Sequence, residues 1–229
     1  MNERGKMKKK VFSGFLLRSA GAGMAVLLVC ALPMLSSCAK KKEQPPKILG
    51  PTESGAIMQQ FQALKKHLQQ NPKDAEAWYD LADIYDQNNL FGPAAQAYKK
   101  AAELKPSGYT FLKLGMCYDA SNQPKEAVSA YEKAVKYMPS YAVAYNNLGV
   151  AYGKIGENGK AIAAFKKALK LNPRYATARY DLGYAYLKNG DKKAALKQYG
   201  ALEKVDQGMA YDLLKKIKAG KSATGGAGA

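Results

Sequence analysis

The sequence predicts an all-α fold in which pairs of helices stack into a solenoid. The first observation is a repeated pair, a leucine followed by alanine or glycine, at intervals of 33, 34 and 34 residues: Leu81-Ala82, Leu114-Gly115, Leu148-Gly149 and Leu182-Gly183. The second is that apolar residues within each unit recur at helical spacing. The third is that turn residues such as Asn88-Asn89 divide each unit in two. Because one helical hairpin cannot bury its apolar stripe alone, neighbouring units must cover it.

The N-terminal segment, residues 1–37, is predicted to be a bacterial lipoprotein signal. Basic residues at positions 4–10 precede an apolar run, residues 21–35, that is too short for a comfortable membrane span. The run ends in Leu-Ser-Ser-Cys at Cys38, which resembles a lipobox, and this resemblance implies cleavage before Cys38 and acylation of its thiol. An uncleaved anchor helix and an ordinary secretory signal remain alternatives. Ala39 resembles the sorting pattern of outer-membrane lipoproteins, so we expect a lipid-anchored protein of the bacterial cell envelope, at the outer membrane and facing the periplasm.

The segment after the signal, residues 38–55, is predicted to be a flexible tether because it combines prolines and lysines without a periodic apolar face. The whole chain carries 36 Lys and Arg against 18 Asp and Glu, and the chain from Cys38 onward stays basic. Loss of Cys30 with the signal and acylation of Cys38 leave Cys117 alone, so we expect no intramolecular disulfide. Cys117 falls on a buried helix position and is interpreted as a small apolar filler.

The rest of the chain divides by the repeat register. Residues 56–74 are expected to form a half unit that closes the N-terminal end of the stack, and residues 208–219 an amphipathic capping helix. The glycine-rich tail, residues 220–229, has no means to fold. Four full units lie between the caps: 75–107, 108–141, 142–175 and 176–207.

Further positions recur in the same register. Each unit carries an aromatic residue in its second half, and the first three units end in proline: Tyr98, Tyr131, Phe165 and Tyr199, then Pro106, Pro139 and Pro173. Over residues 75–207 this pattern resembles the tetratricopeptide repeat family. The resemblance implies a right-handed α-solenoid whose first helices line a concave groove. The glycine at Gly149, which costs about 1 kcal/mol in a helix interior, is then explained by close packing of helices beside the aromatic residues.

The resemblance also implies that first-helix positions outside the packing signature face a ligand. The amides of Asn146 and Asn147 each offer a donor and an acceptor, which suits an extended peptide backbone. The alternative is that both side chains are simply solvated. Acidic residues concentrate on the first helices and lysines on the second, which favours a basic or neutral peptide. A carboxylate-clamp site is disfavoured, since only Asn147 matches it. The candidate peptide-binding residues are Tyr79, Asp80, Asp83, Lys113, Asn146, Asn147, Tyr180 and Asp181.

The sequence offers no pattern for chemistry. His67, the single histidine, is interpreted as a partly buried structural residue, and the Gly153–Lys160 stretch lacks the spacing of a phosphate-binding loop. Asp80, Asp83 and Asp86 lie near one helix face but have no loop to complete a metal site. We therefore expect no catalytic residue, metal, cofactor, small-molecule substrate or nucleic-acid partner.

The function predicted from these observations is that of a non-catalytic scaffold or adaptor that binds a peptide or protein partner in the concave groove. Membrane attachment would be through the N-terminal lipid. The alternative is an accessory or regulatory subunit of an envelope enzyme or of a secretion or assembly complex.

Overall fold

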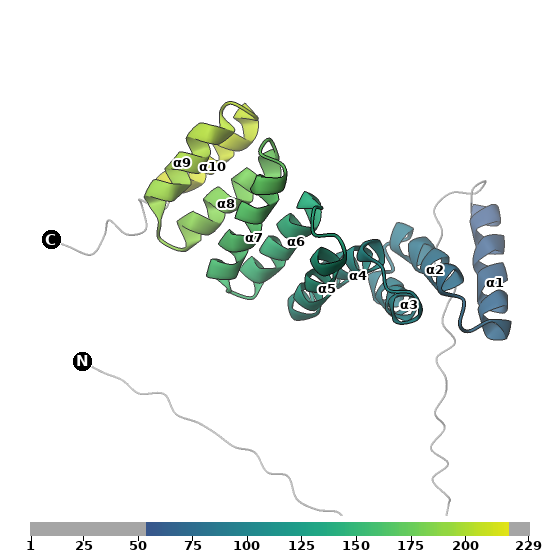
Figure 1. Ribbon diagram of the computed structural model, residues 1–229. Helices are drawn as coiled ribbons and strands as arrows, with labels where there is room; N and C mark the ends of the chain where they lie inside the picture. The colour runs from purple at the N-terminus through teal and green to yellow at the C-terminus, as the bar shows by residue number, and fades with distance from the viewer. Residues whose placement is uncertain (1–53, 220–229) are drawn as a thin grey trace, which may run out of the picture. The chain divides into compact units, whose positions relative to one another are not determined.

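The predicted all-α solenoid is confirmed in the computed structural model, which describes residues 54–219 (Figure 1). The described residues form ten helices and no strand, and all belong to one compact unit. None of these helices is long and apolar enough to cross a membrane. The predicted signal segment, Cys38, the tether up to residue 53 and the tail from residue 220 lie outside the described residues.

The helices pack in order along the chain, each on the one before it. Four helical hairpins make up the stack, and a single helix lies at each end of it (Figure 1). The hairpins are α2 (Ala75–Gln87) with α3 (Phe91–Leu104), α4 (Gly108–Ala120) with α5 (Pro124–Tyr137), α6 (Ala142–Lys154) with α7 (Asn158–Leu171), and α8 (Ala176–Lys188) with α9 (Lys192–Leu202). The end helices are α1 (Ser54–Gln70) and α10 (Gln207–Ala219).

The turn inside each hairpin depends on one residue in the left-handed region of backbone space. Asn89 and Asn122 have φ of 58° and 55°, and Gly156 and Gly190 have φ of 82° and 79°. Asparagine and glycine are the residues that adopt this conformation at least cost. The turn residues seen in the sequence therefore end the first helix of each hairpin.

The small residue of the second and third repeats lets two helices approach closely, as predicted. A Cβ atom added to Gly115 would lie 2.5 Å from the ring of Tyr131, and one added to Gly149 would lie 2.6 Å from the ring of Phe165. Real Cβ atoms do not tolerate such contacts, so each ring occupies the space that the missing side chain leaves. The cost of a glycine in the middle of α6 is offset by this packing.

The last repeat departs from the expected pairing. A Cβ atom on Gly183 would meet Leu213 of α10 at 2.6 Å rather than the signature aromatic Tyr199. Tyr199 is half-buried, and its hydroxyl donates a hydrogen bond to Glu203, four residues later at the end of α9. Since no fifth hairpin follows, the capping helix supplies the covering side chain, and Leu213 and Ile217 are fully buried.

Two single residues are placed clearly by the structure. Cys117 is a fully buried free cysteine, so its predicted burial is confirmed; burial raises the pKa of its thiol to about 12, and its Sγ atom lies 3.8 Å from Oδ1 of Asp86. The expected partial burial of His67 is wrong: its side chain is 46% exposed, and Nε2 lies 2.8 Å from Oδ2 of Asp74. Asp74 is the N-cap of α2 and accepts hydrogen bonds from the first turn, so His67 ties the end of α1 to this cap.

We predict that Gly149→Ala lowers the free energy of unfolding by about 1–3 kcal/mol, the range expected for overpacking a core. The added methyl group would press on the ring of Phe165, which is itself 4% exposed and has little room to move. Urea denaturation followed by circular dichroism measures the change.

The matched control is Gly153→Ala in the same helix. A Cβ atom there meets nothing within 4 Å, so the gain in helix propensity, about 1 kcal/mol, should raise stability. Equal effects of the two substitutions would contradict the packing explanation.

Candidate functional site

Polar side chains link the first helices of successive hairpins. We call the surface formed by α2, α4, α6 and α8 the first-helix face. Lys113 of α4 places Nζ 3.3 Å from Oδ1 of Asp83 and 3.1 Å from Oδ2 of Asp86, both on α2. Lys154 of α6 places Nζ 2.9 Å from Oδ1 of Asp119 on α4. These groups are partly exposed, so each pair contributes about 1 kcal/mol or less to stability.

The third link joins α6 to α8 and involves two of the predicted ligand-binding residues. Asn146 donates from Nδ2 to Oδ2 of Asp181 at 3.2 Å. Asn146 is only 4% exposed, and within the described residues its Oδ1 atom has no hydrogen-bond partner. The expectation that Asn146 faces a ligand freely is therefore wrong, because the next first helix covers it.

The acidic residues of α2 are likewise engaged within the molecule. Asp83 accepts a hydrogen bond from the hydroxyl of buried Tyr98, in addition to its contact with Lys113. Burial is the main cause that raises the pKa of Tyr98 well above the usual value for tyrosine, and the Asp83 carboxylate is the second. The carboxylates of Asp83 and Asp86 are thus compensated by a lysine, and the reason for expecting a basic peptide is lost.

Four predicted residues keep some freedom. Asp80 is exposed, and Asn147 is half-buried without a side-chain hydrogen bond inside the range 54–219. Tyr79 is half-buried and packs edge-on against Tyr98, with ring centroids 5.3 Å apart. Tyr180 lines a pocket, next to Asp181, whose carboxylate is already bound by Asn146.

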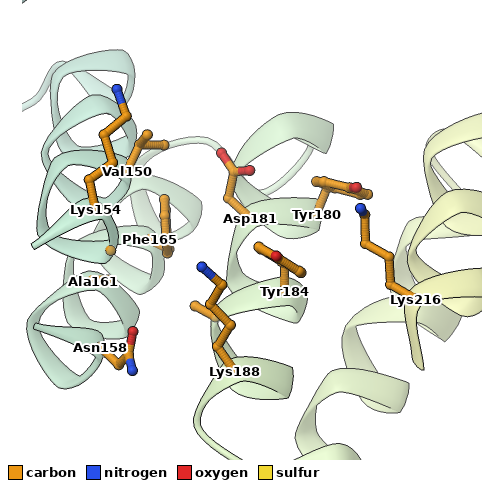
Figure 2. Close-up of a pocket in the computed structure, with 13 residues that line it drawn as sticks. Val150, Lys154, Asn158, Ala161, Phe165, Tyr180, Asp181, Tyr184, Lys188 and Lys216 are labelled. Atoms are coloured by element: carbon orange, nitrogen blue, oxygen red, sulfur yellow. The ribbon is translucent and has the colours of Figure 1, made fainter. Parts of the chain in front are cut away.

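This pocket lies between α6 and α8 and has a volume of about 340 Å³ (Figure 2). The buried side chains of Ala161 and Phe165 provide an apolar base, and Tyr180 and Tyr184 provide aromatic surface. Its lining residues are Gly149, Val150, Gly153 and Lys154 of α6; Asn158, Ala161 and Phe165 of α7; Tyr180, Asp181, Tyr184, Ala185 and Lys188 of α8; and Lys216 of α10.

One of the residues that line the pocket, Gly153, differs in kind from its counterparts in the first two units. Asp86 and Asp119 each stand five residues after the repeated leucine of their units, and the corresponding residue of the third unit is Gly153. A Cβ atom on Gly153 would meet nothing within 4 Å. Where the first two repeats carry a carboxylate that binds a lysine, the third leaves open space.

Charge at the pocket is set by two kinds of group. Asp181 is half-buried, and burial raises the pKa of its carboxyl while the bond from Asn146 opposes that shift. Lys188 and Lys216 place their Nζ atoms 5.1 Å and 5.3 Å from the centroid of the Tyr184 ring. In Figure 2 these two lysines approach Tyr184 from opposite sides.

Sequence reasoning missed several of the lining residues. Tyr184 could have been found, since Tyr180, Tyr184 and Lys188 are spaced four residues apart and share one helix face. The repeat pattern assigns Phe165 only to the core, because its ring fills the space beside Gly149. The structure shows that the same side chain also lines the pocket. Lys216 gave no signal, because the repeat register does not extend to α10.

Within residues 54–219 there is no group of three or more His, Cys, Asp and Glu that could hold a metal ion. The pocket instead combines apolar, aromatic and charged groups at one surface. Such an arrangement suits binding of a side chain together with a nearby charge.

Comparison with known proteins agrees with the repeats. Models described as tetratricopeptide repeat match residues 60–109 and 176–207, and a model described as TPR repeat matches residues 118–156 and 154–190. Superkiller complex protein 3 of Homo sapiens is 28% identical over 97 residues, and that of Mus musculus 27% identical over 97 residues. Each alignment covers 42% of this chain and 6% of the relative, so this chain matches only a small part of those proteins.

Solved structures are similar over most of the chain. A crystal structure of MamA has a TM-score of 0.64 and 26% identity and covers 72% of this chain and 99% of that one. The structure of YrrB, described as a TPR protein with an unusual peptide-binding site, has a TM-score of 0.66 and 21% identity and covers 71% of this chain and 86% of that one. The YrrB likeness shows the fold.

We predict that Asp181→Asn raises the free energy of unfolding above that of the unchanged protein, and that this increase is larger at pH 7 than at pH 3. Burial raises the folded-state pKa of Asp181 above its unfolded value, so stability that is present below the unfolded pKa is lost as the pH rises through the folded pKa. Asparagine keeps an oxygen acceptor for Asn146 but carries no charge that must be desolvated. Urea denaturation of both proteins at the two pH values measures the difference. A difference that did not change with pH would contradict the assigned burial of this carboxylate.

Proposed function

Because this chain belongs to the tetratricopeptide repeat family, we propose that it is a non-catalytic scaffold that holds a peptide or protein partner on its first-helix face. The observation that carries the proposal is the pocket between α6 and α8. The links Lys113–Asp86 and Lys154–Asp119 occupy the polar groups of the preceding repeats. The binding surface is therefore at the third and fourth repeats, where the Asn146–Asp181 hydrogen bond joins α6 to α8 and no lysine–carboxylate pair links these two helices within residues 54–219.

The chemistry of the pocket supports a polypeptide ligand. Tyrosine rings present large contact areas that lose little conformational entropy on binding, and they are common at the energetic centres of protein interfaces. Phe165 offers an apolar contact for a side chain, and half-buried Asn147 has donor and acceptor capacity left for a peptide backbone.

The described residues also favour a non-catalytic role. The buried thiol of Cys117 has a pKa of about 12, so it stays protonated and unreactive. His67 is engaged with the N-cap of α2 and lies on α1, away from the lining of the pocket. The second candidate, an accessory subunit of an envelope enzyme, would use the same surface to position a catalytic partner.

We place this scaffold at the bacterial cell envelope, held at the outer membrane and facing the periplasm through a lipid on Cys38. The support is the sequence alone: a basic start, a short apolar run, and Leu-Ser-Ser before Cys38. A tether of about 16 residues spans on the order of 20–25 Å, which would let the repeats stand clear of the lipid.

We predict that Cys38→Ala abolishes incorporation of labelled palmitate in a bacterial host and releases the protein from the membrane fraction. Acylation needs the thiol of this residue. Cys30→Ala is the matched control and should leave both labelling and fractionation unchanged. Labelling that depended on Cys30 instead would show that Cys30, and not Cys38, carries the lipid, and would contradict the prediction.

The pocket can be blocked without disturbing its surroundings. Gly153→Phe adds a ring at a position that lines the pocket and has open space around its Cβ atom. We predict that peptides selected from a random displayed library on the unchanged protein lose most of their affinity for Gly153→Phe, about tenfold or more, which is the loss of roughly 1.4 kcal/mol.

The matched control for this block is Gly92→Phe, at an exposed helical glycine of α3 that also meets nothing within 4 Å. Circular dichroism should show unchanged helicity for both variants. If selected peptides bind Gly153→Phe as well as they bind Gly92→Phe, the pocket is not the binding site. A partner enzyme whose turnover changes on binding would favour the accessory-subunit role.

A further inference from the structure

The repeat register shows that Lys188 lacks a carboxylate that its counterpart in the preceding unit has. Lys154 binds Asp119, and Lys188 stands 34 residues after Lys154. The residue 34 positions after Asp119 is Gly153. Both Gly153 and Lys188 line the pocket. One glycine therefore opens the pocket and also removes the partner that the lysine would have.

Two of the three lysines that line the pocket are uncompensated within residues 54–219. Neither Lys188 nor Lys216 has an ion pair there, in contrast to Lys113 and Lys154 on the same face. Their contacts are with the ring of Tyr184. Asp181, the carboxylate that lines the pocket, is hydrogen-bonded by Asn146 and forms no ion pair with a lysine in that range.

The charge of the chain differs between the N-terminal and C-terminal parts of the stack. Residues 54–157 carry 11 Lys and Arg against ten Asp and Glu, whereas residues 158–219 carry 14 against five. The remaining segments are basic as well: residues 1–53 carry ten Lys and Arg against three acids, and residues 220–229 carry one lysine and no acid. A compensating anion is therefore best supplied by another molecule, and the basic C-terminal part of the stack would attract it.

We propose that the pocket binds an acidic segment of a partner protein, in which a carboxylate takes the place left empty at Gly153 and pairs with Lys188. A neighbouring apolar side chain of the segment packs against Phe165 and Tyr184, and Lys216 adds a second positive charge. The proposal rests on the proposed function and names the chemistry of its ligand. The carboxylate belongs to a side chain, so no free C-terminus is required.

The test uses the purified full chain and three peptides with blocked ends: acetyl-Gly-Glu-Phe-Glu-Gly-amide and the versions in which both glutamates are glutamine or lysine. Isothermal titration calorimetry at low salt measures their affinities. We expect the acidic peptide to bind about five- to tenfold more tightly than the glutamine peptide, the range of one partly desolvated ion pair, and the lysine peptide to bind least. Added salt should reduce the preference.

Gly153→Asp is the decisive variant. It restores the carboxylate that the register lacks, so Lys188 gains an internal partner and the preference for the acidic peptide should disappear. Gly153→Asn has the same size without the charge and should keep the preference. Both substitutions are made where a Cβ atom meets no neighbour, and circular dichroism confirms that the helices remain.

A second pair of variants separates the pocket from general charge. Lys188→Ala with Lys216→Ala should remove the preference for the acidic peptide. Lys193→Ala with Lys197→Ala removes two exposed lysines of α9 that do not line the pocket and should keep it. An equal loss in both pairs would overturn the proposal in favour of non-specific attraction.

The remaining outcomes distinguish this proposal from the proposed function. Equal or tighter binding of the glutamine or lysine peptide, lost on Gly153→Phe, would overturn the acidic ligand and leave the pocket as the binding site. Peptide binding that Gly153→Phe does not change would overturn both. A Kd of about 1 mM corresponds to a binding free energy of roughly 4 kcal/mol, which is a weak interaction. If none of the three peptides binds at that concentration, the result would also count against the acidic ligand.

Discussion

The contact between a small residue on one helix and a ring on the next sets the spacing of the two helices in the second and third hairpins. Gly115 against Tyr131 and Gly149 against Phe165 bring each pair of helices so close that no side chain fits between them. This distance is repeated with a period of 33 or 34 residues, so successive first helices lie within reach of one another's side chains. The links from Lys113 to Asp83 and Asp86, and from Asn146 to Asp181, depend on that spacing.

A repeated backbone also makes each register position comparable between units. Five residues after the leucine the chain carries Asp86, Asp119, Gly153 and Leu187 in turn. In the first two units the carboxylate links neighbouring helices, whereas in the third its absence leaves room for a ligand. The same position thus carries a carboxylate that pairs with a lysine in the first two units and a glycine that lines the pocket in the third.

The sequence was sufficient for the fold because its main signals are local and repeated. Helical spacing, turn residues such as Asn89 and Gly190, and the leucine-glycine pairs each depend on neighbours within one or two units. The site was predicted less well. Register places Asn146 on the first helix but does not show that Asp181, 35 residues later, covers it, and Lys216 enters the pocket from a helix outside the repeats. Side-chain reach between helices and the direction of a capping helix are properties of the folded stack.

The polar links also bear on how binding and folding are connected. In a repeat array stability is approximately the sum of the units and of the interfaces between neighbours. Charged links join α2 to α4 and α4 to α6, whereas α6 and α8 are joined by an amide bound to a half-buried carboxylate. Burial raises the pKa of that carboxyl, so its ionised form costs stability that an exposed carboxylate would not. An acidic ligand beside Lys188 would compensate the charge of that lysine, not that of Asp181, and a ligand at free concentration L that binds only the folded chain stabilises it by RT ln(1 + L/Kd). The repeat that gives up an internal link to make room for a partner is therefore the one whose stability the partner would restore.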